Sequence, residues 1–508
     1  MKKYLALVVA FFFSCTSEIE SPDSILQKYP ELMETYSSSY KSNSSGTSSS
    51  GKAKSSSSVS SSGKASSSSK VSASSKSSSS SEDDEDEDSS SSKTSSASGT
   101  SSAGKTSSAS GTSSASKTSS ASGASSPSGT SSASNTPTPV PSDCPISETG
   151  PVSVYGALKA CVVGGKGRIC GSGSYANTPV QVRGVSLFWS NTDWGGEKFF
   201  KEDAVNAMVD GWKAEIIRVP MGASIPGTEQ YSGSYATDKP GNMARVERAI
   251  NAAIDRGVYV IIDWHSHNAH VDVATSTEFF RTMATKYGCY PNVIFEIYNE
   301  PKCSDGKDSY WCDNDNKPWT SWSQIKTYAN TIIPVIRNNG GANRLILVGT
   351  PYFSQAVSEA DGNYLTDNNV GYVFHFYADT HKRDGAAPPS WRSTYEAGIT
   401  KVLNAGKPVF VTEYGTTDAD GGNYEEDHYY SHNASSSDAW HSFMDANKIS
   451  SCAWNLGDKY EGSAFFGTGS DFDMSSWDSE SAMTESGQYI FNKLNGYANN
   501  RGSAPWRY

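Results

Sequence analysis

The sequence predicts an α/β fold: a (β/α)8 TIM barrel preceded by a signal peptide and a long disordered serine-rich linker. Eight short runs rich in β-branched and aromatic residues recur between residues 180 and 458. Stretches with helical spacing lie between them and end at glycine, where helices commonly stop. Apolar strands that alternate with helices are typical of a parallel sheet covered on both faces, and eight such units favour a closed barrel.

Each expected strand is a short apolar run bounded by turn residues. In chain order the runs are VQVRGVSLF (180–188), AEIIRVPM (214–221), VYVIIDWH (258–265), NVIFEIYNEP (292–301), RLILVGTP (344–351), VGYVFHFY (370–377), PVFVTEYG (408–415) and SSCAWNLGD (450–458). The segments 241–257 and 319–340 have the apolar spacing of helices. These helices exclude a β-sandwich, and the absence of a glycine-rich phosphate turn argues against a doubly wound sheet.

The first 15 residues, MKKYLALVVAFFFSC, have a basic tip and a short apolar core, as secretory signals do. The core is too short for a stable membrane span. Ser14 before Cys15 resembles a bacterial lipoprotein signal, which makes Cys15 a candidate lipid anchor to the outer membrane; ordinary secretion is the alternative. We therefore expect a signal peptide at 1–15, a linker at 16–145 and the folded domain at 146–508.

The linker consists mainly of serine with alanine, glycine, threonine and lysine, and KTSSASGTSSA recurs in near copies. Such a segment cannot bury enough apolar surface to offset its ordering entropy. The formal net charge is −12, and the run EDDEDED at 82–88 supplies seven negative charges. Nucleic-acid binding is not expected, since it would require clustered lysine and arginine.

Polar residues stand at the ends of the expected strands, where barrel enzymes gather their active sites. They are Arg218, His265, Asn299, Glu300, His375, Tyr377, Glu413 and Trp454. Side chains alternate along a strand, so Glu300 should share a face with Glu296, and Glu413 with Val409 and Val411. On this basis we expect Glu300 and Glu413 to converge over the barrel mouth.

Two carboxylates in a cleft suit glycoside hydrolysis, in which one protonates the leaving oxygen and the other attacks or activates water. Arg218 could keep one carboxylate ionised, and a tryptophan face could stack on a sugar. Glu296 and Asp263 are expected to be structural. His267 and His270 close to His265 could suggest a metal cluster, but no further ligand pattern supports one.

Four later histidines are expected in loops or on the surface. They are His381, His428, His432 and His441.

The motifs IRVP, VIIDWH, FEIYNEP, LVGTP, VFHFYADTH, VFVTEYGTTDADG and AWNLGDKYEGSAFF resemble glycoside hydrolase family 5, most closely its subfamily 2 of bacterial endo-β-1,4-glucanases. The resemblance covers about residues 150–495. It implies a retaining mechanism without cofactor, with Glu300 as acid/base and Glu413 as nucleophile. It implies supporting roles for Arg218, His265, Asn299, His375, Tyr377 and Trp454, and substrate contacts from Lys459, Glu461, Ala419 and Asp420.

Two segments depart from the family pattern. Phe188 and Trp189 stand where the family usually has a histidine, and Gly222 stands where an aromatic residue is common. Trp189 is taken as a further substrate contact. The departures point to an altered distal glucose subsite.

We therefore expect a monomeric endoglucanase that acts on β-glucan and needs no metal. A mannanase, a xyloglucanase or a mixed-linkage glucanase on the same barrel is the alternative within enzymes. An inactive surface carbohydrate-binding protein is the alternative of another class, although such a protein has no reason to keep both carboxylates.

Cysteine usage fits export, because seven cysteines follow Cys15. This odd number leaves at least one unpaired within the chain. We favour the pairs Cys161–Cys170 and Cys303–Cys312, since each closes a short loop, and the second would brace the loop after Glu300. Zinc binding is not expected because no Cys-x-x-Cys occurs.

Overall fold

The computed structural model describes residues 144–224, 231–306, 312, 318–383, 395–419, 432–459, 461–467, 477 and 480–500. The expected signal peptide with Cys15, the expected linker up to residue 143, Asp420 and His428 lie outside these residues. In the ranges described, no helix is both long and apolar enough to cross a membrane.

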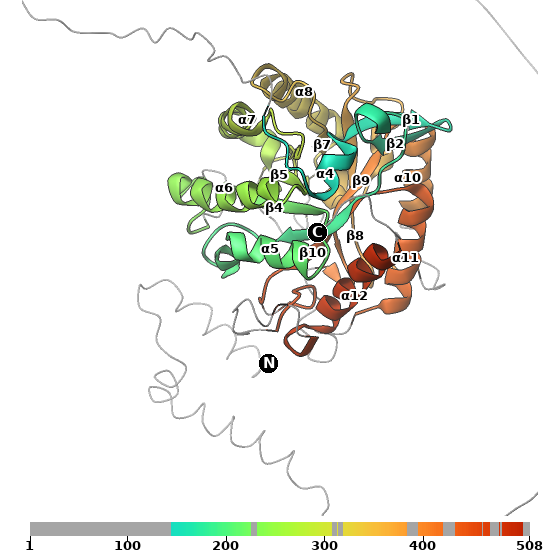
Figure 1. Ribbon diagram of the computed structural model, residues 1–508. Coiled ribbons are helices and arrows are strands. Elements are labelled where there is room, and N and C mark those ends of the chain that lie inside the picture. The colour runs from blue at the N-terminus through green and yellow to red at the C-terminus, as the bar shows by residue number, and fades with distance from the viewer. Residues whose placement is uncertain are drawn as a thin grey trace, which may run out of the picture. The chain divides into compact units, whose positions relative to one another are not determined.

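All eight expected strands are present and form a closed parallel barrel in the order β10-β3-β4-β5-β6-β7-β8-β9 (Figure 1). The strands are β3 (Arg183–Leu187), β4 (Ile216–Gly222), β5 (Tyr259–His265), β6 (Val293–Glu296), β7 (Ile346–Val348), β8 (Val370–Tyr377), β9 (Val409–Gly415) and β10 (Ser451–Leu456). Because they are parallel, their carboxyl ends meet at one mouth of the barrel.

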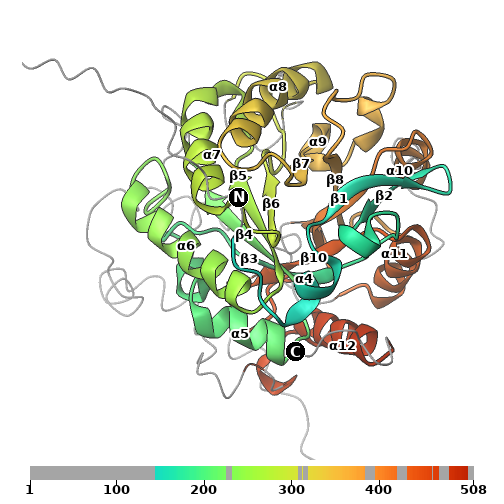
Figure 2. The same ribbon diagram turned by 45° about the horizontal axis from the view of Figure 1, so that its top comes forward.

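Helices surround the strands (Figure 2). They are α5 (Glu202–Asp210), α6 (Lys239–Asp255), α7 (Val273–Tyr287), α8 (Trp322–Asn338), α9 (Pro351–Ser354), α10 (Tyr395–Asn404), α11 (Ala434–Asn447) and α12 (Glu485–Asn500). The α6 helix buries Val246, Ala249, Ile250 and Ala253 at helical spacing. The α8 helix is capped by Ser321, which precedes it and forms a capping box with Gln324.

A small unit that was not predicted lies before the barrel. It consists of α4 (Gly150–Tyr155) and the antiparallel hairpin of β1 (Lys159–Val163) and β2 (Lys166–Cys170). The hairpin turns at Gly164 and Gly165, which both have positive φ, and a Gly-Gly pair is a recognised hairpin signal. The Tyr259 hydroxyl of β5 donates to the Gly156 carbonyl at 2.7 Å, which ties this unit to the amino-terminal end of the barrel.

Three disulfides are formed among the described cysteines. Cys161–Cys170 and Cys303–Cys312 confirm the two favoured pairs. The third, Cys144–Cys289, joins residues 145 positions apart and was not predicted, because spacing alone does not fix connectivity over such a distance. Cys452 is a buried free thiol.

The barrel interior is layered. Its lower part is apolar and is filled by alternating strand residues such as Ile261, Ile294 and Phe410 together with residues of α4 and the hairpin. Two residues further along β5 and β6, the inward positions become Asp263 and Glu296, which are fully buried. An apolar layer therefore lies beneath a polar layer at the mouth.

The later histidines are expected in loops or on the surface. His381 does lie in a loop, although it is buried, whereas the expectation is wrong for His441, which is buried on helix α11. His381 Nδ1 lies 3.0 Å from both the backbone nitrogen and the backbone oxygen of Tyr377, so the chain after β8 folds back onto that strand. His441 lies on the buried face of α11, with Nδ1 3.2 Å from the Tyr497 hydroxyl. The helical spacing of His441 with the buried residues Ser437, Trp440 and Met444 could have predicted its burial.

Candidate active site

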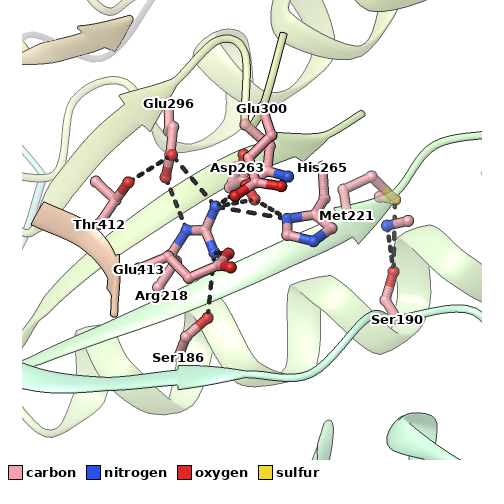
Figure 3. Close-up of polar contacts among 12 residues, drawn as sticks. Ser186, Ser190, Arg218, Met221, Asp263, His265, Glu296, Glu300, Thr412 and Glu413 are labelled. Atoms are coloured by element: carbon pink, nitrogen blue, oxygen red, sulfur yellow. Dashed lines mark hydrogen bonds and ion pairs between the residues drawn. The ribbon is translucent and has the colours of Figure 1, made fainter. Parts of the chain in front are cut away.

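The guanidinium of Arg218 on β4 lies at the centre of the polar layer and is fully buried (Figure 3). Its Nε donates to Glu296 Oε2 at 2.8 Å, and its Nη1 donates to Glu413 Oε2 at 2.8 Å. Its Nη2 donates to Asn299 Oδ1 at 2.6 Å and lies 3.0 Å from Asp263 Oδ2. One cation thus holds side chains from β5, β6, β9 and the loop after β6.

Glu413 reaches this cation because β9 carries a β-bulge. Between the pairs Val373–Phe410 and His375–Glu413, two residues of β8 face three of β9. The extra residue breaks the alternation, so the consecutive Thr412 and Glu413 both contact interior side chains. The expectation that Glu413 shares a face with Val409 and Val411 is therefore wrong, since both valines pack in the core cluster that includes the surrounding helices.

Glu300 is not placed by strand alternation either, because β6 ends at Glu296. The turn that follows is held by neighbouring loops: Glu300 N donates to the Ser266 carbonyl at 3.3 Å, and the Ser354 hydroxyl donates to the Asn299 carbonyl at 2.6 Å. Glu300 therefore lies at the mouth as predicted, although the strand alternation used to predict it ends at Glu296.

The two carboxylates nevertheless converge as predicted. One oxygen of Glu300, one of Glu413 and a ring nitrogen of His375 all lie within 4.8 Å of one another. The Glu300 side chain is 14% exposed and that of Glu413 is 6% exposed. Glu300 is thus the carboxylate more open to the cleft.

Both oxygens of Glu413 accept hydrogen bonds. Arg218 donates to Oε2, and the Tyr377 hydroxyl donates to Oε1 at 2.8 Å. Burial and the nearby Glu300 raise the pKa of Glu413 above its ordinary value, whereas His375, Arg218 and the Tyr377 hydrogen bond lower it and so offset part of the rise. Arg218 keeps its charge, because its three carboxylate neighbours raise its pKa even against its own burial.

His375 lies against Glu300 on the other side of the pair. Its Nδ1 is 2.9 Å from Glu300 Oε1, and its Nε2 is 2.8 Å from the Thr412 hydroxyl. Burial lowers the pKa of His375 to about 4, so its ring is neutral at neutral pH.

His265 is oriented by a carboxylate and two indole rings. Its Nδ1 lies 2.6 Å from Asp263 Oδ2, within hydrogen-bond distance. Its ring stacks on Trp454 with centroids 5.4 Å apart and meets Trp189 edge-on at 4.1 Å. Burial lowers the pKa of His265 well below its usual range, which leaves this ring neutral as well.

Aromatic rings line one side of the mouth. Phe188, Trp454 and Tyr377 form a cluster against which Trp189, Trp194 and Ala419 pack. Lys459 lies above the Phe188 ring at 5.2 Å, and its Nζ is 3.6 Å from Glu461 Oε2.

Glu461 also accepts hydrogen bonds from the Trp454 indole nitrogen at 3.2 Å and from the Asn455 amide. The expected substrate contacts that the structure describes therefore lie together at this side of the mouth. They are Trp189, His265, Tyr377, Ala419, Trp454, Lys459 and Glu461.

A second aromatic group, on the side of Glu300, was missed. Trp319, Tyr352 and Phe353 have ring centroids about 5 Å apart, 4.9 Å for Trp319–Tyr352 and 5.4 Å for Trp319–Phe353. Tyr352, Phe353 and Ser354 have positive φ, a conformation that is costly for residues other than glycine. The two consecutive aromatic residues after the LVGTP motif are the feature of the sequence that could have predicted this group.

Glu300, His375 and Glu413 are also the residues whose spacing could hold a metal ion. The charge next to them opposes a dication, because Arg218 bonds directly to Glu413. His375 in turn bonds directly to Glu300 and Thr412 through its two nitrogens. These contacts suit a pair of carboxylates with one shared cation better than they suit a metal centre.

Comparison with known proteins agrees with this chemistry. The profile of Cellulase (glycosyl hydrolase family 5) matches residues 174–460, more than half of the chain. Endoglucanase Z of Dickeya dadantii is 39% identical over 322 residues, which cover 63% of this chain and 64% of the relative. Endoglucanase A of Evansella cellulosilytica is 36% identical over 56% of this chain and 51% of the relative. The chain thus spans less than two thirds of either relative.

Solved structures resemble the barrel over nearly their whole length. The catalytic domain of Thermobifida fusca endoglucanase Cel5A is 28% identical with a TM-score of 0.53, over 68% of this chain and 99% of that domain. A variant of that domain in complex with cellotetraose matches over the same shares with a TM-score of 0.54. The eight-stranded barrel, the paired carboxylates and the family profile together show that this chain belongs to glycosyl hydrolase family 5.

Proposed function

We propose that the barrel is an endo-β-1,4-glucanase that cleaves internal bonds of cellulose and related β-glucans with retention of configuration. The observation that carries this proposal is the approach of Glu300 and Glu413 oxygens to within 4.8 Å. Retaining glycosidases hold their carboxyl groups about 5–5.5 Å apart, whereas inverting enzymes need about 6.5–9.5 Å to admit a water molecule. The endoglucanase names of the relatives support the choice of substrate.

Glu413 is the proposed nucleophile. Arg218 and Tyr377 bind its two oxygens and favour its charged form. The same bonds fix the orientation of the carboxylate toward the cleft. The nucleophilic oxygen is thus preorganised for attack on the anomeric carbon.

Glu300 is the proposed acid/base. It is the more exposed carboxylate, and His375 bonds its Oε1 at 2.9 Å. Glu300 protonates the leaving oxygen in the first step and accepts a proton from water in the second. Asn299, whose Oδ1 is bound to Arg218, can present its amide NH2 group to a sugar hydroxyl.

The aromatic region around Trp454 is the proposed site for the glucose units on the non-reducing side. Trp454, stacked on His265, offers a ring face to a pyranose, and Trp189 extends the aromatic surface. Lys459 and Glu461 supply charged hydrogen-bonding groups beside it. Ala419 and Asp420 complete this set of proposed contacts, Asp420 on sequence grounds alone.

We also propose that the protein is exported and tethered as a monomer, by a lipid on Cys15, to the outer membrane. The basic and apolar first 15 residues support this, as does the serine-rich composition of residues 16–145. Such a tether would let the domain at 146–508 reach polysaccharide outside the cell.

The substrate proposal is tested on carboxymethylcellulose, lichenan and mannan side by side. We expect viscosity to fall early on carboxymethylcellulose, with release of reducing sugar, and little reaction on mannan. Glu300→Gln should reduce turnover of the polysaccharide about 10²–10⁴-fold, the usual contribution of a general acid. Glu359→Gln is the matched control, because Glu359 is an exposed glutamate on the short 3-10 helix Val357–Ala360 between β7 and β8. Faster release of reducing sugar from mannan than from carboxymethylcellulose would contradict the proposed substrate and favour a mannanase.

The roles of the two carboxylates are separated by azide rescue. Glu300→Ala should still be glycosylated by substrates with good leaving groups and should then stall, so azide should yield the β-glycosyl azide. Glu413→Ala lacks the nucleophile, and azide should rescue it, if at all, to the α-azide. Wild-type product of inverted configuration, seen by NMR in the first minutes, would contradict the assignment.

The Tyr377 hydrogen bond predicts a shift in the pH profile. The raised pKa of Glu413 means that kcat/KM is lost, as pH falls, at a higher pH than for an ordinary glutamate. Tyr377→Phe removes a bond that lowers this pKa, so the acidic limb should move to still higher pH. Tyr372→Phe, on the same strand but packed in the outer core, is the control. An acidic limb that stays in place or moves to lower pH in Tyr377→Phe would be inconsistent with this role.

The tether is tested by deleting residues 16–141. Because the described core lies within residues 144–500, turnover of soluble glucan and the cooperative melt should be nearly unchanged. Cys15→Ser in the full chain should move the protein from the membrane fraction to the soluble fraction. A lost cooperative melt would show that the barrel needs the N-terminal region, and retained membrane association in Cys15→Ser would exclude the lipid anchor.

A further inference from the structure

A continuous chain of hydrogen bonds links Glu300 to the buried centre of the barrel. Glu300 Oε1 lies 2.9 Å from His375 Nδ1, and His375 Nε2 lies 2.8 Å from Thr412 Oγ1. Thr412 Oγ1 lies 2.7 Å from Glu296 Oε1, a contact visible in Figure 3. His375, Thr412 and Glu296 are all at most 1% exposed. Each of the three contacts has normal hydrogen-bond length.

The direction of these bonds follows from the donors available. Glu296 accepts from Arg218 Nε at 2.8 Å and from Nη2 at 3.2 Å, so it acts as a carboxylate acceptor. A threonine hydroxyl has one hydrogen, and Thr412 must use it to donate to Glu296. The lone pair of the same oxygen then accepts a hydrogen from His375 Nε2.

His375 therefore carries its proton on Nε2 and presents a lone pair at Nδ1. The groups that face the ring are Arg218, Glu296, Glu413, His267 and Glu300. Burial and the Arg218 cation disfavour a second proton on the ring, against the pull of the two buried carboxylates. With a neutral ring, the hydrogen in the bond between Nδ1 and Glu300 Oε1 must come from Glu300.

We propose that Thr412 is a positioning residue that sets the tautomer of His375 and thereby keeps Glu300 protonated before glycosylation. This inference rests on the proposed role of Glu300 as acid/base. The bulge in β9 is what makes the arrangement feasible, because it turns the adjacent Thr412 and Glu413 into the same interior. One strand thus supplies both the proposed nucleophile and the residue that prepares the acid.

The same chain favours the second half of the reaction. Once Glu300 has given its proton to the leaving oxygen, its carboxylate faces the lone pair on Nδ1 without a hydrogen between them. This repulsion raises the basicity of Glu300. Glu300 then takes a proton from the attacking water, while the water oxygen bonds to the anomeric carbon and the bond to Glu413 breaks.

The first test compares Thr412→Val with Thr412→Ser. Valine has the shape of threonine but no hydroxyl, so the ring is free to move its proton to Nδ1 and donate to ionised Glu300. The alkaline limb of kcat/KM should then move to lower pH. Turnover of cello-oligosaccharides should fall about tenfold or more, because a general acid contributes about 10²–10⁴-fold. Turnover of a dinitrophenyl cellobioside, which needs little acid assistance, should change far less.

Thr412→Ser restores the hydroxyl and should restore the wild-type pH profile. Thr416→Val is the matched control, since Thr416 is a buried threonine just after β9 whose hydroxyl bonds Ser486, away from the pair. An active Thr412→Val enzyme with an unshifted alkaline limb and an unchanged ratio between the two substrates would overturn the proposal.

The second test does not depend on the folding of Thr412→Val or on any activity. The ¹⁵N spectrum of histidine-labelled wild-type protein, with His375 assigned by its loss in His375→Gln, should show a protonated Nε2 and an unprotonated Nδ1 at neutral pH. A protonated Nδ1 would overturn the proposal. A wild type that is inactive on every β-glucan would instead refute the proposed function, while the spectrum would still decide the tautomer.

Discussion

The polar layer of this barrel depends on one buried cation. Arg218 has no exposed surface, and three carboxylates and one amide from different strands and loops surround it. Buried charges are costly unless they are paired and hydrogen-bonded, and removing one partner of such a pair commonly costs about 3–5 kcal/mol. The ion pairs around Arg218 therefore hold the side chains of β5, β6 and β9 in fixed positions through direct contacts.

This arrangement also gives the three glutamates different hydrogen-bond partners. Glu296 binds the guanidinium from below and remains entirely buried, whereas Glu413 takes only one of its nitrogens and turns its other oxygen to Tyr377. Glu300 makes no ion pair with Arg218 among the contacts described and instead meets a neutral imidazole. The three glutamates thus differ in their access to positive charge, and this difference in environment can separate their protonation states.

The mouth above this layer is asymmetric. Aromatic rings around Trp454 and Trp189 lie on one side of the carboxylates, and the Trp319, Tyr352 and Phe353 rings lie on the side of Glu300. The departures at Phe188 and Gly222 belong to the first side. There Phe188 packs against Trp454 with ring centroids 5.3 Å apart, and a side chain at position 222 would press against Asn191.

The sequence by itself predicted the eight strands, the helices between them and the two carboxylates that converge at the mouth, because apolar periodicity and short motifs are local properties of the chain. It also predicted the two short-range disulfides. Tertiary structure alone decided how the carboxylates meet. Alternation would have placed Glu413 with Val409 and Val411, and only pairing with β8 and β10 reveals the bulge that turns it inward.

The long-range disulfide Cys144–Cys289 and the bonds that hold Glu300 beyond β6 likewise join segments distant in the sequence. The proposed role of Thr412 also depends on tertiary structure. A threonine beside a glutamate indicates no function in the sequence, and only the neighbouring strand β8 brings His375 Nε2 within 2.8 Å of its hydroxyl.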